Sequence, residues 1–292
     1  MSKLPEPSVV PSRTLPPLLR LQQLGRVLEQ DFEGKQEVIR LMLLSALAGE
    51  HLLIIGPPGT AKSALVSTLA RLISARYFEY LLTRFSEPNE LFGPIDLRAF
   101  REGVYKRRGE HMLPTAEVVF LDEIFKANSA ILNSLLTLLN ERRLHTGGER
   151  IEVPLLALFA ASNEMPSDDS LEALLDRFLV RVGSHNLESY QFHRLIELGL
   201  RHEQGPPSGS AEAPSASQPL LSAEELRQLQ AQLRRRLRFS DEFLNTYKGL
   251  VFQIRGEGVS LSDRRAVRLL KLCAASAMLD GREETDAGDL FV

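Results

Sequence analysis

Residues 56–63, GPPGTAKS, combine the residue types that bind a nucleoside triphosphate. Gly56 and Gly59 let backbone amides turn toward phosphate oxygens, Lys62 can reach the β- and γ-phosphates, and the Ser63 hydroxyl can ligate Mg²⁺. A helix that begins beside the loop adds the positive end of its dipole. We therefore expect ATP and Mg²⁺ to bind here, through Gly56, Pro57, Pro58, Gly59, Thr60, Ala61, Lys62, Ser63 and Ala64.

Ala61 departs from the usual pattern of this loop, which has glycine before the lysine. Glycine is required only where φ is positive or where a Cβ would collide with the ligand, whereas alanine is the best helix former. At the first turn of the helix, Ala61 should have a negative φ, and Ala61→Gly should preserve hydrolysis. We therefore interpret the loop as functional rather than degenerate.

Three polar side chains stand at the ends of two apolar strands downstream of the loop. The segment 118–123, VVFLDE, ends in Asp122, which we assign to the metal, and Glu123, which we assign to polarising the attacking water. Asn163 ends the strand in LALFAASNE, where its amide can hold that water. Asparagine is also common in turns that follow a strand, so the functional interpretation of Asn163 depends on the presence of Asp122 and Glu123.

Arginines complete the candidate site. Arg177, in SLEALLDRFLVRV, lies between an apolar helix and a strand. It could form a surface ion pair, or it could enter a neighbouring subunit's site as an arginine finger if the chains form a ring. Arg264 and Arg265, in VSLSDRRAVRLL, open a helix near the end of the chain.

The composition is that of an ordinary globular protein with a sizeable core. Of its 292 residues, 43% are hydrophobic and 25% charged, and the formal net charge is -3, which disfavours nucleic acid as the default partner. The one cysteine, Cys273, lies in an apolar stretch and is expected to be buried, which fits a reducing cytoplasm. Residues 1–17 are expected to be a disordered tail and not a secretion signal or a membrane anchor, because they contain prolines and no unbroken apolar stretch.

Strands and helices alternate through the first two thirds of the chain. Apolar periodicity predicts helices at 18–29, 35–49, 62–74 and 128–141, and strands at 51–55, 77–82, 118–121, 155–161 and 178–182. This order predicts an α/β domain over 18–200, with a parallel sheet covered on both faces. Residues 201–220, rich in Gly, Pro, Ser and Ala, are expected to be a flexible linker, and 221–292 a smaller all-helical domain.

In combination, these motifs resemble those of AAA+ ATPases. GPPGTAKS, VVFLDE, ASNE, ALLDRF and SDRR occur in the order of Walker A, Walker B, sensor 1, arginine finger and sensor 2. The segments EYLLTRFSEPNELFGPIDLRAF and VFLDEIFKANSAILNSLLTLLNERR are similar to the MoxR family and, within it, to the RavA (regulatory ATPase variant A) subgroup. This resemblance covers nearly all of residues 20–292.

The resemblance implies a P-loop nucleotide domain with a helical lid, assembled as a homo-hexamer with ATP at the subunit junctions. Arg177 would then be the arginine finger, and Arg264 would contact nucleotide from the lid. It also implies β-hairpin insertions near 94–112 and 142–153, which the charged, glycine-containing sequence there supports. RavA-like proteins carry further domains after this module, so this chain is expected to be either truncated at the C-terminal side of the lid domain, which we favour, or a reduced relative.

Three functions are consistent with these residues. The leading hypothesis is a cytoplasmic Mg²⁺-dependent ATPase that remodels or activates a partner, such as a von Willebrand factor A domain protein, in a chaperone-like manner. A nucleic-acid-stimulated motor is the second, supported only by the basic segment at 105–111. The third is a nucleotide-gated scaffold with little turnover, against which the set Asp122, Glu123, Asn163 and Arg177 argues, because a pure switch needs no acid to activate water.

Overall fold

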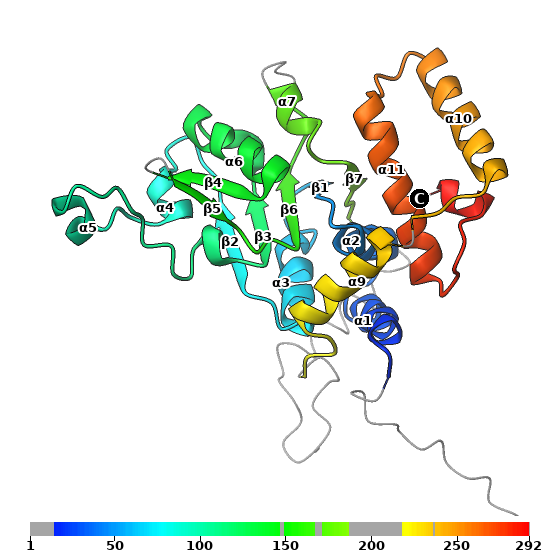
Figure 1. Cartoon of the computed structure of the whole chain (residues 1–292), viewed down its shortest axis with the longest axis horizontal. Coiled ribbons are helices and arrows are strands. Elements are labelled where there is room, and N and C mark those ends of the chain that lie inside the picture. The colour runs from blue at the N-terminus through cyan, green and yellow to red at the C-terminus, as the bar shows by residue number, and fades with distance from the viewer. Residues whose placement is uncertain (1–14, 147–148, 167–170, 187–217, 236, 292) are drawn as a thin grey trace, which may run out of the picture.

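A five-stranded parallel sheet forms the centre of the computed structural model, which describes residues 15–146, 149–166, 171–186, 218–235 and 237–291. The strand order is β2-β3-β6-β1-β7, and each ladder is parallel (Figure 1). The strands are β1 (Leu52–Ile55), β2 (Tyr77–Leu81), β3 (Val118–Asp122), β6 (Ala157–Ser162) and β7 (Val180–Gly183). All five predicted strands are present, with ends shifted by at most two residues, and the predicted parallel α/β fold is confirmed.

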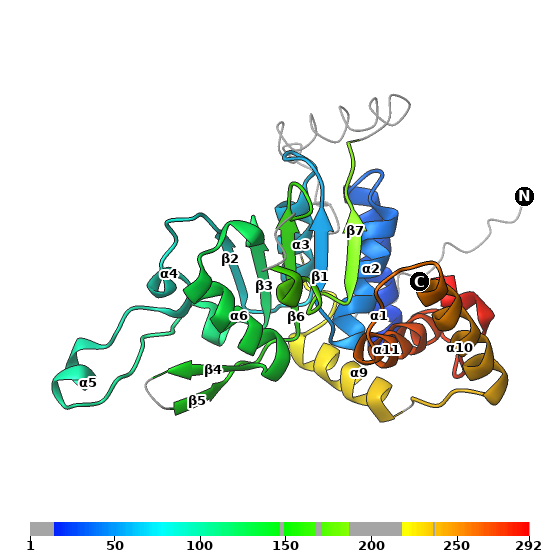
Figure 2. The same ribbon diagram turned by 90° about the horizontal axis from the view of Figure 1, so that it is seen from above.

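Helices cover both faces of this sheet because alternate side chains of each strand point to opposite sides. Leu52 and Ile54 of β1 pack on the face covered by α1 (Pro17–Asp31), α2 (Gln36–Ala48) and α3 (Lys62–Leu72). Leu53 packs on the other face, with α4 (Pro88–Phe92) and α6 (Ser129–Glu141) (Figure 2). Burial on both faces explains why the sequence of β1 is an unbroken apolar run.

Two insertions extend from the sheet domain. Residues 94–112, which we call the arm, reach the left end of the molecule in Figure 1 and carry the helical turn α5 (Leu97–Arg101). The predicted β-hairpin was wrong here: only one antiparallel bridge, Ile95 with Arg107, forms. Asp96 accepts backbone hydrogen bonds from Arg98 and Ala99, which starts a helical turn instead. The second hairpin is confirmed as β4 (Arg143–Thr146) paired with β5 (Glu149–Glu152).

Three helices follow the sheet domain along the chain. Residues of α9 (Ala223–Arg235) belong to the core of the sheet domain, and Gln230 donates hydrogen bonds to the carbonyls of Ala46 and Leu156. Beyond it, α10 (Asp241–Gly256) and α11 (Asp263–Leu279) lie at the end of the molecule opposite α5 (Figure 1). Side-chain caps begin both helices, Ser240 for α10 and Ser262 for α11, as their sequences indicate.

Short helical segments complete the described residues: η2 (Leu113–Thr115), η3 (Ile124–Lys126), α7 (Glu172–Leu175) and η6 (Ala287–Phe291). The predicted tail, apart from residues 15–17, and residues 201–217 of the predicted linker lie outside the described residues. The domain boundaries at 200 and 221 therefore stay predictions. Within the part of the chain that the structure describes, no helix has the length and apolarity needed to cross a membrane.

Candidate nucleotide site

The phosphate-loop candidate joins β1, in the interior of the sheet, to α3. Its first glycine is fixed by packing: the Gly56 amide donates to the Ser162 carbonyl at 3.0 Å, and a Cβ added to Gly56 would lie 1.9 Å from the Ser184 carbonyl oxygen. Only glycine fits at this position. Gly59 has φ +81, and a Cβ there would meet open space, so its requirement is conformational. The loop therefore needs both glycines, for different reasons.

The side chain of Lys62 lies along its own loop. Its Nζ donates to the carbonyls of Gly56 at 2.7 Å and Pro57 at 2.9 Å, and the residue is 8% exposed. Burial lowers the pKa of Lys62, and the nearby carboxylates of Asp122 and Glu123 oppose that shift. The lysine and both predicted acids therefore share one electrostatic environment at the carboxyl ends of β1 and β3.

Ala61 contradicts the predicted backbone conformation. It has φ 61 and ψ 24, which is left-handed, and it forms the N-cap of α3 rather than the first helical residue. The predicted negative φ was wrong because Ala61 lies outside the helix at its N-cap, where the backbone does not have helical angles. Glycine adopts this conformation at little cost, whereas an alanine there is strained.

The strand ends bring the predicted acid and amide into direct contact. Asn163, after β6, donates from Nδ2 to Oε1 of Glu123 at 2.5 Å, and the amide of Glu123 donates to Oδ1 of Asp122 at 2.9 Å. The other Glu123 oxygen lies 3.3 Å from Nζ of Lys126. Glu123 has φ 53, a conformation that is strained for a non-glycine residue and is typical of functional sites.

Lys35 is a site residue that the sequence reasoning missed. It precedes α2, is 7% exposed, and donates from Nζ to Oγ of Ser184 at 3.0 Å and to the carbonyl of His185 at 2.7 Å. Burial lowers its pKa, and the positive charge of Lys62 lowers it further. No motif predicts this role, because a lysine before a helix is usually solvated and Lys35 lies well ahead of the loop in sequence.

The donor set fits a magnesium ion shared with phosphate. Ser63, in the first turn of α3, and Asp122, at the end of β3, supply one hydroxyl and one carboxylate at the same edge of the sheet. Among the described residues, no group of three or more His, Cys, Asp or Glu side chains could hold a metal alone. Magnesium usually binds through one or two protein oxygens together with phosphate oxygens and water, which is what these two residues offer.

The predicted arginines lie at the other edge of the sheet. Arg177 precedes β7, where its backbone amide donates to the Leu174 carbonyl, and Arg264, at the start of α11, donates to Oδ1 of Asn140 at 2.8 Å. Asn140 is at the carboxyl end of α6, and the Arg265 side chain donates to the Leu179 carbonyl just before β7. Within one chain, Arg177 and Arg264 are therefore brought together, but not with Lys62.

Cations at this second edge have incomplete partners. The Nε atoms of Arg177, Arg181 and Arg265 are buried without a hydrogen-bond partner. Burial lowers the pKa of Arg177, and the charges of Arg264 and Arg268 lower it further, while only Asp176 opposes them. The positive charges of this arginine cluster exceed the negative charge beside them, and such a cluster is suited to an anion supplied from outside the chain.

Comparisons with known proteins give a consistent result. Residues 19–231 match the family model of the MoxR domain in the MoxR-vWA-beta-propeller ternary systems, and residues 231–292 match an AAA lid domain. An uncharacterized protein of Methanocaldococcus jannaschii is 36% identical over 277 residues, covering 93% of this chain and 69% of that protein. The chaperone MoxR1 of Mycobacterium tuberculosis is 28% identical over 153 residues, covering 51% of this chain and 40% of that protein.

One solved structure extends the comparison to the fold. The crystal structure of an inferred ATPase from Cytophaga hutchinsonii superposes with a TM-score of 0.75 at 18% sequence identity, covering 94% of this chain and 84% of that chain. At this identity the likeness bears on the fold alone. The sheet, its helices and the lid therefore have a counterpart in an experimentally determined structure.

Proposed function

This chain belongs to the MoxR family of AAA+ ATPases, and we propose that it hydrolyses ATP in a homo-hexameric ring and thereby remodels or activates a partner protein. The observation that carries the proposal of hydrolysis is the contact between Asn163 and Glu123 beside Lys62. A protein that only bound nucleotide would need the lysine but not an oriented acid. The narrower RavA assignment stays a prediction.

The carboxyl ends of β1, β3 and β6 form the first edge of the site, and each predicted residue there has a role in this proposal. Lys62 exchanges its loop carbonyls for the β- and γ-phosphate oxygens, which restores the ion pairing that its buried ammonium lacks. Glu123 takes a proton from the attacking water, and Asn163 fixes the carboxylate and the water in line with the γ-phosphate. Mg²⁺, when held by Ser63 and Asp122, would neutralise charge on the phosphate oxygens.

Arg177 and Arg264 are proposed to act on the nucleotide of a neighbouring subunit. A head-to-tail ring places the first edge of one chain against a different face of the next, and six such contacts close the ring. The γ-phosphate of the neighbour would then supply the negative charge that balances Arg177 and Arg264. Charge developing on that phosphate during transfer is the target of an arginine finger.

Steady-state hydrolysis tests the catalytic assignment. Glu123→Gln should bind ATP but turn over roughly 10²- to 10⁴-fold more slowly, because the base is lost while the phosphate contacts remain. Glu164→Gln is a matched control, since Glu164 is an exposed acid beside Asn163. Equal rates for wild type and Glu123→Gln would contradict the assignment, and binding without turnover by the assembled wild type would favour a nucleotide-gated scaffold.

A second measurement tests the junction. Arg177→Ala should retain ATP affinity and lose roughly 10³-fold or more in turnover, the range typical of arginine fingers. Normal hydrolysis by Arg177→Ala would show that the residue is only a surface ion-pair partner of Asp176, at 3.2 Å. Analytical ultracentrifugation with and without ATP would show whether the ring forms.

The proposed partner is a protein with a von Willebrand factor A domain. The matching family model is described for MoxR-vWA-beta-propeller systems, which supports this class of partner for the present chain. The arm offers a contact surface, because Leu97 is 68% and Phe100 56% exposed at its tip. The Glu123→Gln variant with ATP should retain such a partner from the source organism on a column, and Phe100→Asp in that background should release it.

A further inference from the structure

Glu50 is a buried carboxylate that the nucleotide site does not use. It follows the αL residue Gly49 at the end of α2 and directly precedes His51 and β1, and only 2% of it is exposed. Its backbone amide donates to the Ser45 carbonyl at 2.9 Å, which fixes its position at the amino end of β1. A buried carboxylate lowers the stability of the fold unless it is paired, so its partners indicate what it does in the structure.

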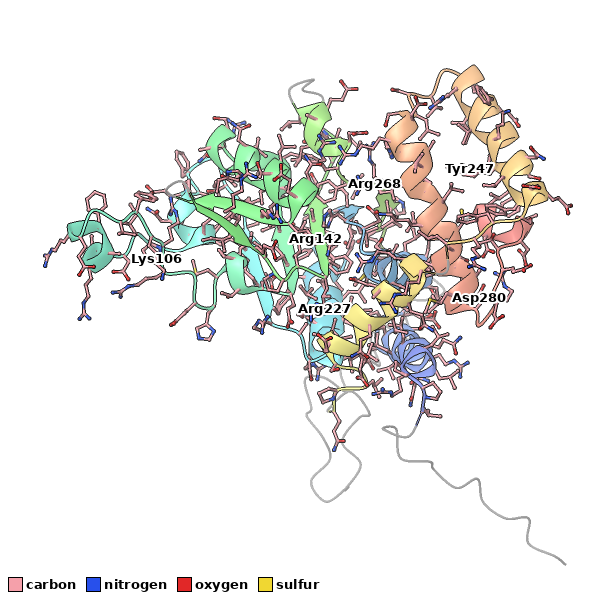
Figure 3. The ribbon with its side chains drawn as sticks, in the orientation of Figure 1. Lys106, Arg142, Arg227, Tyr247, Arg268 and Asp280 are labelled. Atoms are coloured by element: carbon pink, nitrogen blue, oxygen red, sulfur yellow. The ribbon has the colours of Figure 1, made fainter. Side chains whose placement is uncertain are left out.

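Both partners of Glu50 come from the lid helix α11. Arg268 bonds to Oε2, and Nζ of Lys271 bonds to Oε1 at 3.0 Å, so each carboxylate oxygen has a cation. Figure 3 labels Arg268 between α11 and the sheet domain. Burial alone would raise the pKa of Glu50, but the hydrogen bonds and charges of Arg268 and Lys271 outweigh it and lower the pKa. The group is therefore an anion at neutral pH, joined to two cations of another domain.

Helical spacing connects this ion pair to Arg264. Residues 264, 268 and 271 follow each other at intervals of four and three, so they lie along one face of α11. Arg264 is exposed, lies one turn before Arg268, and donates to Asn140 of its own chain. Fixing Arg268 therefore fixes the direction in which Arg264 leaves the helix.

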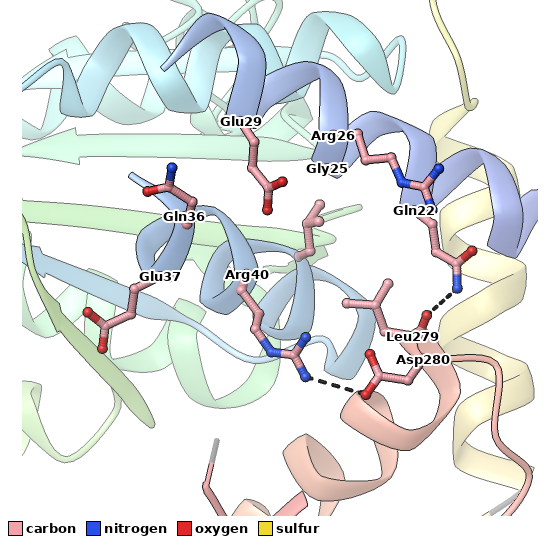
Figure 4. Close-up of a pocket in the computed structure, with 10 residues that line it drawn as sticks. Gln22, Gly25, Arg26, Glu29, Gln36, Glu37, Arg40, Leu279 and Asp280 are labelled. Atoms are coloured by element: carbon pink, nitrogen blue, oxygen red, sulfur yellow. Dashed lines mark hydrogen bonds and ion pairs between the residues drawn. The ribbon is translucent and has the colours of Figure 1, made fainter. Parts of the chain in front are cut away.

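The other end of α11 is attached separately. Near its carboxyl end, Gln22 bonds to the Leu279 carbonyl, and Arg40 lies 3.5 Å from the Asp280 carboxylate, across a surface pocket (Figure 4). The Arg40 and Asp280 side chains are 49% and 38% exposed, whereas that of Glu50 is 2% exposed. Exposed pairs contribute little, so the main ion pair that holds α11 to the sheet domain is the buried one at Glu50, beside the hydrogen bonds of Arg264 and Arg265 nearer the start of the helix.

We propose that Glu50 is a positioning residue, which holds α11 so that Arg264, beside Arg177, is presented to the nucleotide of the neighbouring subunit. This inference rests on the proposed ring junction. In this proposal Glu50 acts through Arg268 and Lys271 of α11, and not by contact with nucleotide or water. Its loss should lower hydrolysis at the neighbour's site while its own chain's loop, at the opposite edge of the sheet, still binds ATP.

Hydrolysis by the full chain gives the first test. Glu50→Gln should reduce kcat at least tenfold while KM for ATP changes less than twofold. Lys271→Met removes one of the two cations at a partly exposed position and should also reduce kcat, by a smaller factor. It replaces Glu50→Gln as the test variant if Glu50→Gln does not fold. Arg40→Ala, which removes the ion pair with Asp280 and a hydrogen bond to Ser276 at the other end of α11, should leave kcat unchanged. Wild-type kcat in Lys271→Met and Glu50→Gln would overturn the proposal.

Mixed assemblies separate a positioning role from general damage. Lys62→Ala chains should bind no ATP but supply intact arginines to a neighbour. In an equal mixture with Glu50→Gln chains, half of the chains keep a loop that binds ATP, and half of those have an intact neighbour in a head-to-tail ring. The mixture should therefore restore roughly a quarter of wild-type activity. If Arg177→Ala is not rescued by the same mixing, the ring junction itself fails. If Arg177→Ala is rescued but Glu50→Gln is not, Glu50 does not act through the neighbour and this inference is wrong.

Discussion

Ala61→Gly is predicted to stabilise the protein, because Ala61 is left-handed at the N-cap of α3. An L-residue in this conformation costs about 1–2 kcal/mol relative to glycine, and the extra freedom of glycine in the unfolded chain returns roughly 0.5–1 kcal/mol of that. The Cβ of Ala61 is exposed, so little packing is lost. We expect the free energy of unfolding to rise by about 0.5–1 kcal/mol.

Urea unfolding without nucleotide, followed by circular dichroism, measures this difference. The matched control is Ala64→Gly, an exposed position two residues into the same helix, which should lower the free energy of unfolding by about 1 kcal/mol because glycine is a poor helix former. Steady-state hydrolysis by Ala61→Gly should stay within about twofold of wild type, since residue 61 offers phosphate only its backbone amide, which glycine keeps. A destabilised Ala61→Gly would refute the reasoning from the backbone angle.

Three further predictions concern buried groups near the site. His51 is fully buried and its pKa is lowered to about 3, so between pH 6.5 and 3 the unfolded chain binds a proton that the folded chain does not. As the pH falls through this window, the free energy of unfolding should drop by up to about 1.4 kcal/mol per pH unit. His51→Gln should reduce that slope in denaturation series at pH 7, 6 and 5. Gly56→Ala should abolish binding of a fluorescent ATP analogue, because its Cβ would collide with the Ser184 carbonyl. Lys35→Met should weaken ATP binding about tenfold in calorimetry with little change in kcat, because a cation beside Lys62 is lost; unchanged affinity would assign Lys35 a purely structural role.

The sequence was sufficient for the sheet and for the first edge of the site. Apolar runs bounded by glycine or acids locate the strands, and because parallel strands end at one edge, Glu123 and Asn163 were expected at the same edge of the sheet. The pairing of β3 with β6, which the sequence did not predict, then brings them together. The hydrogen bond between them follows from topology plus residue type. Lys35 was not predictable in this way, because its partners Ser184 and His185 are far from it in sequence and nothing local marks the lysine as buried.

Local backbone conformation was harder to predict than topology. The positive φ of Ala61 depends on how the loop meets α3, and that of Glu123 on the turn into η3, neither of which residue type alone reveals. In the arm, the charged, glycine-containing sequence indicated a hairpin, but the Asp96 cap gave Leu97–Arg101 a helical turn. The Asp96 cap favours a helical turn there, and the described residues of the arm belong to no sheet whose neighbouring strand would stabilise an extended backbone.

The separation of Lys62 from Arg177 has a consequence for how activity is controlled. A four-residue strand such as β1 or its parallel neighbour β7 spans about 13 Å, so Arg177, which precedes β7, is separated by the width of the sheet from phosphates at the carboxyl end of β1 in the same chain. If both sets act on ATP, as proposed, the complete site exists only between two chains. The arginine set is held in part by Glu50 across the boundary between sheet domain and lid. A movement of the lid in one subunit would therefore change hydrolysis in the next, which is a physical route by which a partner bound to one chain could influence the ring.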